Sequence, residues 1–434
     1  MKLKKNIEID INKIFLSCLD NLNNNNYTNK SYIEKIARNL ILDTLGCAIS
    51  GWTKNQPRKI LNQLGCQESG SIIFPGTPAL SEAAAAYIIA VGACWDEACG
   101  GLAIANGRPG LHVVPVALSL GMEKPFSEVI KSIIFGFEIA SRAGIIFKIK
   151  QDLHVDGIWG SFGSVATASY LVNKNLLFDS LCSIGCQLTQ SLYLPVKYGS
   201  TIRNLYAGRS VADSIRLVSD IGLGISSPPK LEIPKYMFEF KNDYKFSSKH
   251  WYISDSYFKK HAGARHLHYG VEAALSINSF GITPDEIISI ELEIYDEALR
   301  YCGNRKPTSR LQAQFSLSFG IAYAIIYGHL NPDAFDEKAL NDQRINRIEE
   351  LIKIKTFPSL NRSAKLVVKT SNLKKIIEVQ NISGDPECPL SEDELIDKFI
   401  TYSKYTLGAD SAKKIANSII NSSINLPLKK VISC

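Results

Sequence analysis

A single histidine stands directly ahead of a segment built from very small residues, and this stretch is the clearest candidate for chemistry. His154 is followed by VDGIWGSFGSVATASYL, in which glycine, serine, alanine and threonine dominate. Small side chains let a helix pack closely on its neighbours, so the segment is predicted to be a buried helix. A helix that begins near residues 157–159 would place unpaired amides and a positive dipole end beside the imidazole. The stretch therefore predicts either an anion site next to a proton-transfer group or a buried structural histidine.

A second polar stretch, GACWDEACGGLAIANGRPGLHVVP, follows an apolar segment and contains Asp96, Glu97, Arg108 and His112. Charged side chains beside so apolar a segment need ionic partners or solvent in a cleft. Two neighbouring carboxylates could serve as acid and base, or could orient a cation such as Arg108. A salt-linked loop without a catalytic role is the alternative.

Two further stretches concentrate cations. KYGSTIRNLYAGRSVADS contains Arg203 and Tyr206, and FKKHAGARHLHYG contains Lys259 and Lys260. Cations placed before a helix start suit the recognition of carboxylate or phosphate. The His-x-His pair in the second stretch lacks a carboxylate or a third histidine at ligand spacing, so we predict no metal site.

Size and composition exclude several classes of protein. A chain of 434 residues exceeds the usual size of one compact core, so two domains are expected. A net charge of +7 spread over this length gives little support to nucleic-acid binding. The N-terminus is a poor secretory signal, and no apolar run approaches the ~20 residues of a membrane span. The ten cysteines form no CxxC pair, which favours reduced thiols and a cytoplasmic location.

The pattern of helix and strand signals predicts a mainly α protein with an added α+β unit. Residues 1–270 show helical spacing, with serine caps expected at Ser31 and Ser81. ISIELEIY alternates apolar and polar residues and predicts a strand, and KLVVKTSNLKKIIEV predicts two strands joined by a turn. We therefore predict a large all-helical domain at 1–270, a smaller α+β lid at 271–390, and helices at 391–434 that return to the first domain.

Taken together, the motifs of this chain resemble the MmgE/PrpD family, which includes 2-methylcitrate dehydratase, cis-aconitate decarboxylase and iminodisuccinate epimerase. The resemblance is carried in order by LDTLGCAISG, GFEIASRAG, H-x-x-G-x-x-G-x-F-G, LYAGRSVADSIRLVSDIGLG, KKHAGARHLHYGVEAAL, QAQFSLSFGIAYAIIYG and GDPECPLSEDELIDKF. It implies a large helical domain, a smaller lid, a homodimer, and lyase chemistry in a cleft between the domains without metal or organic cofactor.

Residue by residue, the resemblance implies that two basic residues of the family's site are retained, while several residues around them differ. The family's cleft histidine matches His154, and the lysine that opens its K-x-Y-P run matches Lys259. Several polar positions of the family differ here; they fall on Cys94, Ala98, Arg108, Arg203, His261, Ala262, Ala264 and Phe319. These changes imply a less polar or larger ligand than a tricarboxylate.

We expect His154 to be the principal acid/base, with a pKa lowered by the helix N-terminus. Lys259 is expected to neutralise an enolate or act as partner acid, and Asp96 to orient a cation or relay a proton. The residues expected to bind substrate are Arg108, Arg203, Glu97, Tyr206, Lys260 and Phe319.

The expected reaction is proton abstraction next to a carbonyl or carboxylate of a small anionic substrate, leading to dehydration, decarboxylation or isomerisation. Two alternatives stay open at this point. One is a cyclase or isomerase of specialised metabolism on the same scaffold, and the other is a binding protein that has lost the family's activity.

Overall fold

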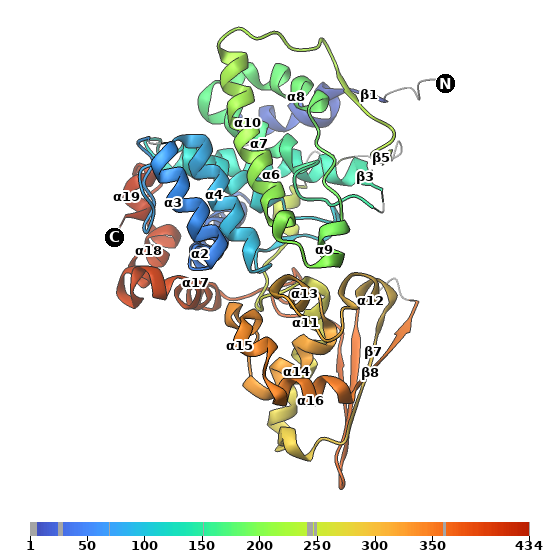
Figure 1. Ribbon diagram of the computed structural model, residues 1–434. Helices are drawn as coiled ribbons and strands as arrows, with labels where there is room; N and C mark the ends of the chain where they lie inside the picture. The colour runs from blue at the N-terminus through green and yellow to red at the C-terminus, as the bar shows by residue number, and fades with distance from the viewer. Residues whose placement is uncertain are drawn as a thin grey trace.

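The computed structural model describes residues 7–24, 29–68, 70–150, 152–240, 246, 250–358 and 362–433. These residues form a large helical part and a smaller α+β part that projects from it (Figure 1). The mainly α class predicted from the sequence is confirmed.

The helical part is organised around long, almost fully buried helices. Ser81 caps α4 by accepting a hydrogen bond from the Ala84 amide, as predicted. No side-chain hydrogen bond caps α2, which begins at Lys30, so the predicted cap at Ser31 is wrong. The helices are α1 (Ser17–Asn23), α2 (Lys30–Trp52), α3 (Asn55–Gln67), α4 (Glu82–Trp95), α5 (Pro109–Leu120), α6 (Phe126–Ile146), α7 (Gly160–Val172), α8 (Leu177–Cys186), α9 (Leu194–Tyr198) and α10 (Tyr206–Gly222).

Close backbone contact between α6 and α7 explains the run of small residues after His154. A Cβ atom on Gly163 would lie 2.6 Å from the carbonyl oxygen of Gly136, and one on Gly160 would lie 2.5 Å from the His112 ring. Only glycine fits at these two positions, which offsets its entropic cost in a helix. The predicted buried helix is confirmed, although it begins at Gly160 and not at 157–159.

Three two-stranded antiparallel sheets also lie in the predominantly helical part. They pair β1 (Ile7–Ile9) with β4 (Leu231–Ile233), β2 (Gly101–Leu102) with β6 (Ser256–Tyr257), and β3 (Phe147–Ile149) with β5 (Phe238–Phe240). No local pattern in the sequence predicts these strands, because each has two or three residues and a partner far along the chain.

The smaller part is a four-stranded sheet with helices packed on it. The strand order is β10 (Lys374–Val379), β9 (Ala364–Lys369), β7 (Ser289–Tyr295) and β8 (Ile352–Phe357). The three strands predicted from sequence are confirmed, and β8, which pairs parallel with β7, was missed. The helices of this part are α11 (Arg265–Leu275), α12 (Asp296–Cys302), α13 (Arg310–Gln314), α14 (Leu317–Tyr327), α15 (Glu337–Leu340) and α16 (Gln343–Leu351).

The C-terminal helices lie beside the helical part (Figure 1). These are α17 (Glu392–Leu407), α18 (Ala409–Asn421) and α19 (Leu428–Ile432). Helices α17 and α18 pack on α2, and α19 contacts α6. Helix α11, which spans the predicted domain boundary at residue 270, packs on α14 and on the sheet.

None of the helices in the described ranges is both long enough and apolar enough to cross a membrane. The nine cysteines within those ranges are all free thiols.

Candidate active site

A cavity of about 370 Å³ lies where loops of the helical part meet α11, α12 and the end of α13. One end is lined by charged groups and an imidazole, which we call the site cluster: Glu97, Arg108, His154, Asp156, Arg203 and Lys259. The rest of the lining mixes aromatic and charged side chains; it includes Tyr193, Tyr257, Ala264, His266, Tyr301 and Phe315, together with Lys148, Lys150, Arg265, Glu297, Arg300 and Arg362. The cavity therefore joins the site cluster to a partly aromatic surface.

His154 lies in the loop before α7 and is almost fully buried. Its Nδ1 accepts the backbone N–H of Asp156 at 3.1 Å, and its Nε2 lies 3.2 Å from Nε of Arg203, which is always a donor. Burial, reinforced by Arg203, lowers the pKa of His154 to about 4. The ring is therefore neutral near pH 7, as expected, but burial and not a helix terminus is the main cause.

The site cluster is a network in which each carboxylate meets two or more cations. Glu97 accepts from Arg108 at 3.1 Å, from Arg203 at 2.5 Å and from Lys259 at 3.2 Å. Asp156 accepts from Arg108 and lies 3.6 Å from Arg203. Burial alone would raise the pKa of both carboxyls, but the neighbouring cations hold both pKa values well below their usual range. Three cations against two carboxylates leave one net positive charge.

Local backbone geometry places these carboxylates. Glu97 follows the end of α4 and has a φ of 52°, in the left-handed region, which turns the chain sharply. Gly157, with a φ of 84°, turns the chain directly after Asp156. The Gly157 amide donates to Nε2 of His112 at 3.0 Å, and Nδ1 of His112 lies 3.2 Å from the Arg108 carbonyl oxygen. His112 therefore ties the start of α5 to the loop that carries His154.

Lys259 lies two residues after the end of β6 and is 2% exposed. Its Nζ donates to the Glu97 carbonyl at 2.6 Å, to the Glu97 carboxylate at 3.2 Å and to the Gly263 carbonyl at 3.2 Å. The three N–H groups of the ammonium are thus matched by three protein acceptors. Burial lowers the pKa of Lys259, and Glu97 counteracts this shift.

Five of the candidate residues predicted from the sequence line this cavity. Asp156 and Tyr193 also line it, but they were not predicted. Asp156 takes the position beside Arg108 that was expected for Asp96. The signal that could have found it is its place two residues after His154, within the same glycine-rich motif. Nothing in the sequence around Tyr193 marks it as a lining residue.

Asp96 does not line this cavity and is not part of the site cluster. It is fully buried, accepts from Ser50 Oγ at 2.6 Å, and pairs with Arg310 of α13 at 2.6 Å. Arg310 lines a separate and larger cavity of about 890 Å³, whose lining includes none of the site cluster. Asp96 therefore links the helical part to the smaller part and makes no contact with Arg108 within the hydrogen bonds and ion pairs of the described residues.

Three other candidates also lie outside the cavity lining. Lys260 is exposed and pairs with Glu394 at 3.0 Å. Phe319 is fully buried in α14 and packs in the core. Tyr206 packs edge-on against His154, with ring centroids 5.8 Å apart, and its hydroxyl donates to the Leu192 carbonyl.

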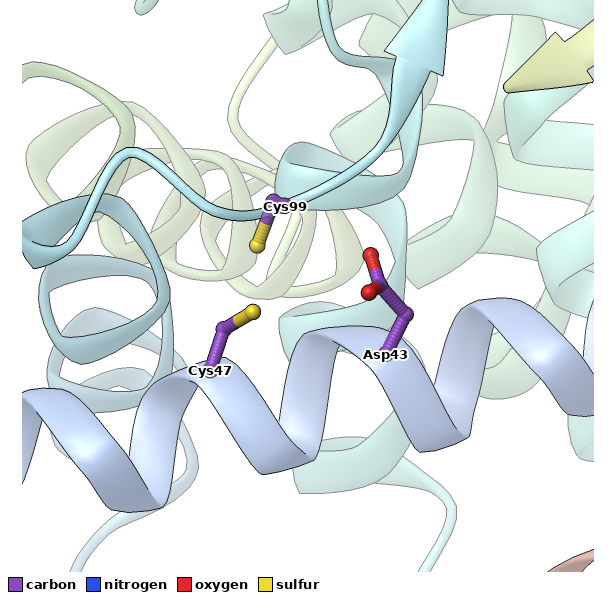
Figure 2. A group of neighbouring side chains, drawn as sticks. All are labelled: Asp43, Cys47 and Cys99. Carbon is purple, nitrogen blue, oxygen red and sulfur yellow. The ribbon is translucent and has the colours of Figure 1, made fainter. Parts of the chain in front are cut away.

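A second buried group of potential ligands surrounds Asp43 (Figure 2). Within the described residues, the carboxylate of Asp43 and the thiols of Cys47 and Cys99 lie within 4.8 Å of one another. However, Nζ of Lys398 donates to Asp43 at 2.5 Å, and the Gly100 amide donates to its other oxygen at 2.8 Å. An ammonium thus already neutralises the only carboxylate of the group, so this arrangement is a poor cation site.

Comparison with known families decides the assignment. Residues 23–217 match the MmgE/PrpD N-terminal domain, and residues 261–423 match the MmgE/PrpD C-terminal domain. The chain belongs to the MmgE/PrpD family. This family includes dehydratases and other lyases. A search of curated proteins finds no match to the chain.

Proposed function

We propose that this MmgE/PrpD protein is a cofactor-independent lyase or isomerase that removes a proton next to a carbonyl or carboxylate of a small anionic substrate. The observation that carries the proposal is the neutral, buried imidazole of His154 at a cavity whose charged end has a surplus of positive charge. A neutral imidazole can accept a proton, and the nearby cations can stabilise the enolate that results.

Arg203 connects substrate binding to the base. Its guanidinium now points Nε at the Nε2 atom of His154. A substrate carboxylate competes for this guanidinium and so frees the imidazole nitrogen to accept the substrate's proton. The negative charge of the substrate also raises the pKa of the ring, which makes it a better base.

Lys259 acts through its charge and through Glu97. Since its ammonium already donates to three protein acceptors, it holds the Glu97 carboxylate and backbone in place and adds positive potential at the cavity. Arg108 does the same for Asp156. The proposal also includes a homodimer and a cytoplasmic location, which the family resemblance and the free cysteines support.

A binding protein without catalytic activity is the competing function, because both ring nitrogens of His154 face protein donors. Proton exchange separates the two. The protein is incubated in heavy water with citrate, cis-aconitate, pyruvate and phenylpyruvate, and the exchange of carbon-bound protons is followed by NMR. We expect at least one of these acids to exchange faster than it does in protein-free heavy water, and the products seen in the same spectra distinguish lyase from isomerase chemistry.

His154→Gln should lower that exchange by about 10²–10⁴-fold, the usual contribution of a general base. His329→Gln is the matched control, because His329 lies outside the cavity lining. Exchange at the wild-type rate in His154→Gln would refute the role of this residue. Binding of an acid without any exchange in the wild type would favour the binding protein.

A further inference from the structure

Aromatic rings form a continuous wall from the base of the site to the smaller part of the protein. The rings of His154 and Tyr193 are stacked with centroids 5.9 Å apart, and Tyr193 meets Tyr301 edge-on at 5.5 Å. Tyr301 in turn stacks on His266 at 5.4 Å. All four residues line the cavity. We call Tyr193, Tyr301 and His266 the aromatic wall. Such a surface favours flat, conjugated groups over saturated chains.

The hydroxyl of Tyr193 is buried and has no hydrogen-bond partner within the described part of the chain. A buried hydroxyl without a partner is costly, and the residue that carries this one lines the cavity, so a ligand oxygen that binds beside Tyr193 can become its partner. Burial raises the pKa of Tyr193, and the group therefore remains a donor at neutral pH. It can donate to an oxygen of the substrate beside His154.

The cations near the aromatic wall are largely engaged by protein carboxylates. Arg265 makes two hydrogen bonds to Asp385, at 3.2 and 2.6 Å, and Arg362 pairs with Glu297 at 3.0 Å. Arg300 also lines this end but is exposed to solvent, where an ion pair contributes little. Lys148, Lys150 and Arg300 are exposed, so among the buried groups of the lining the surplus positive charge lies in the site cluster, where it matches one carboxylate.

We propose that the site takes a monocarboxylate with a flat aryl or conjugated body and a carbonyl or enol oxygen next to the carboxylate. The carboxylate binds at the site cluster, the body lies along the aromatic wall, and the Tyr193 hydroxyl donates to the neighbouring oxygen. A cavity of about 370 Å³ is near the lower end of the range for small-molecule sites, which suits a substrate of this size. The placement of the carboxylate rests on the proposed function.

Isothermal titration calorimetry with the wild-type protein tests whether the site prefers a ligand with a flat aryl or conjugated body. The probes are trans-cinnamate, 3-cyclohexylpropanoate, which has the same charge and a similar size but is not flat, and citrate. We expect cinnamate to bind about tenfold more tightly than 3-cyclohexylpropanoate, and citrate to bind more weakly than cinnamate. Equal affinity for the two monocarboxylates, tighter binding of citrate, or no binding of cinnamate would overturn the proposal.

Tyr193→Phe tests the hydroxyl while it keeps the ring. We expect this variant to lose about tenfold in affinity for phenylpyruvate, which has an oxygen next to its carboxylate, and to bind cinnamate, which has none, as the wild type does. Tyr198→Phe is the matched control, since Tyr198 is 68% exposed on α9. An equal loss for both probes, or no loss for phenylpyruvate, would contradict the role of the hydroxyl.

Different experimental outcomes would refute the proposed reaction and the proposed ligand class. In His154→Gln, the order of probe affinities should persist while proton exchange is lost. Preserved order without any exchange in the wild type would remove the proposed reaction and leave the ligand class standing. Exchange of citrate with a reversed order of affinities would remove the ligand class and leave the reaction.

Discussion

Two groups of buried charges lie close together in this protein, and they differ in what surrounds them. The site cluster borders a cavity and has one cation in excess. Around Lys398, by contrast, every acceptor belongs to the protein: Asp43 at 2.5 Å, the Ala98 carbonyl at 2.9 Å and the Lys259 carbonyl at 2.7 Å. Burial and charge alone therefore do not set the two groups apart; the cavity and the surplus cation beside it do.

The Lys398 group also has a structural consequence for the site. Its carbonyl partners belong to the two segments that carry Glu97 and Lys259. Helix α17 thus holds both segments in place through Lys398, which does not line the cavity.

The largest effect that we predict is the loss of stability when the cation of the Lys398 group is removed. Lys398→Met leaves the Asp43 carboxylate buried without its cation and should lower the free energy of unfolding by about 3–5 kcal/mol. Lys35→Met is a matched control, because Lys35 joins the same two helices, α2 and α17, through an exposed pair with Glu392. That control should lose at most about 1 kcal/mol. Urea unfolding measures both, and similar losses in the two variants would contradict a specific role for the buried pair.

Acid should destabilise the protein through its buried neutral histidines. The pKa of His154 is about 4 in the folded protein and 6.5 when unperturbed, so the unfolded state binds a proton first as the pH falls. Stability is then lost between about pH 6.5 and pH 4. His261, also with a pKa of about 4, adds to this loss, whereas Glu97 and Asp156, whose pKa values are lowered, begin to contribute only below about pH 5.

His154→Gln should therefore reduce the drop in unfolding free energy between pH 7 and pH 4.5 by about 2–3 kcal/mol. Urea unfolding at the two pH values measures the drop in the wild type and in the variant. An unchanged drop would mean that His154 is protonated in the folded protein at pH 4.5.

The sequence predicted the elements with strong local signals and missed those that depend on distant partners. The alternation of β7 and the small residues of α7 suffice to predict their burial. In contrast, IKIKTF of β8 also alternates apolar and polar residues, but it directly follows α16 without turn residues between them, and its partner β7 lies far back in the chain. Which residues of a helical chain meet at a cavity is likewise a property of long-range packing.

Neighbouring residues show this limit most clearly at the site. Asp96 and Glu97 are adjacent carboxylates, and only Glu97 lines the cavity. The choice follows from the left-handed backbone of Glu97 and from the pairing of Asp96 with Arg310, neither of which has a pattern in the sequence. Residue types therefore predict which groups are available, and the backbone decides which of them face the cavity.

The smallest effect that we predict concerns the adjacent lysines 259 and 260. Lys260 is exposed and pairs with an equally exposed Glu394, so Lys260→Met should change the free energy of unfolding by at most about 1 kcal/mol. It should also leave cinnamate affinity unchanged, because its ammonium is outside the cavity. Lys259→Met leaves Glu97 without one of its three cations and should weaken cinnamate binding clearly. Calorimetry on both variants compares their affinities for cinnamate directly. A similar loss of affinity in the two would support the substrate-binding role that the sequence predicts for Lys260.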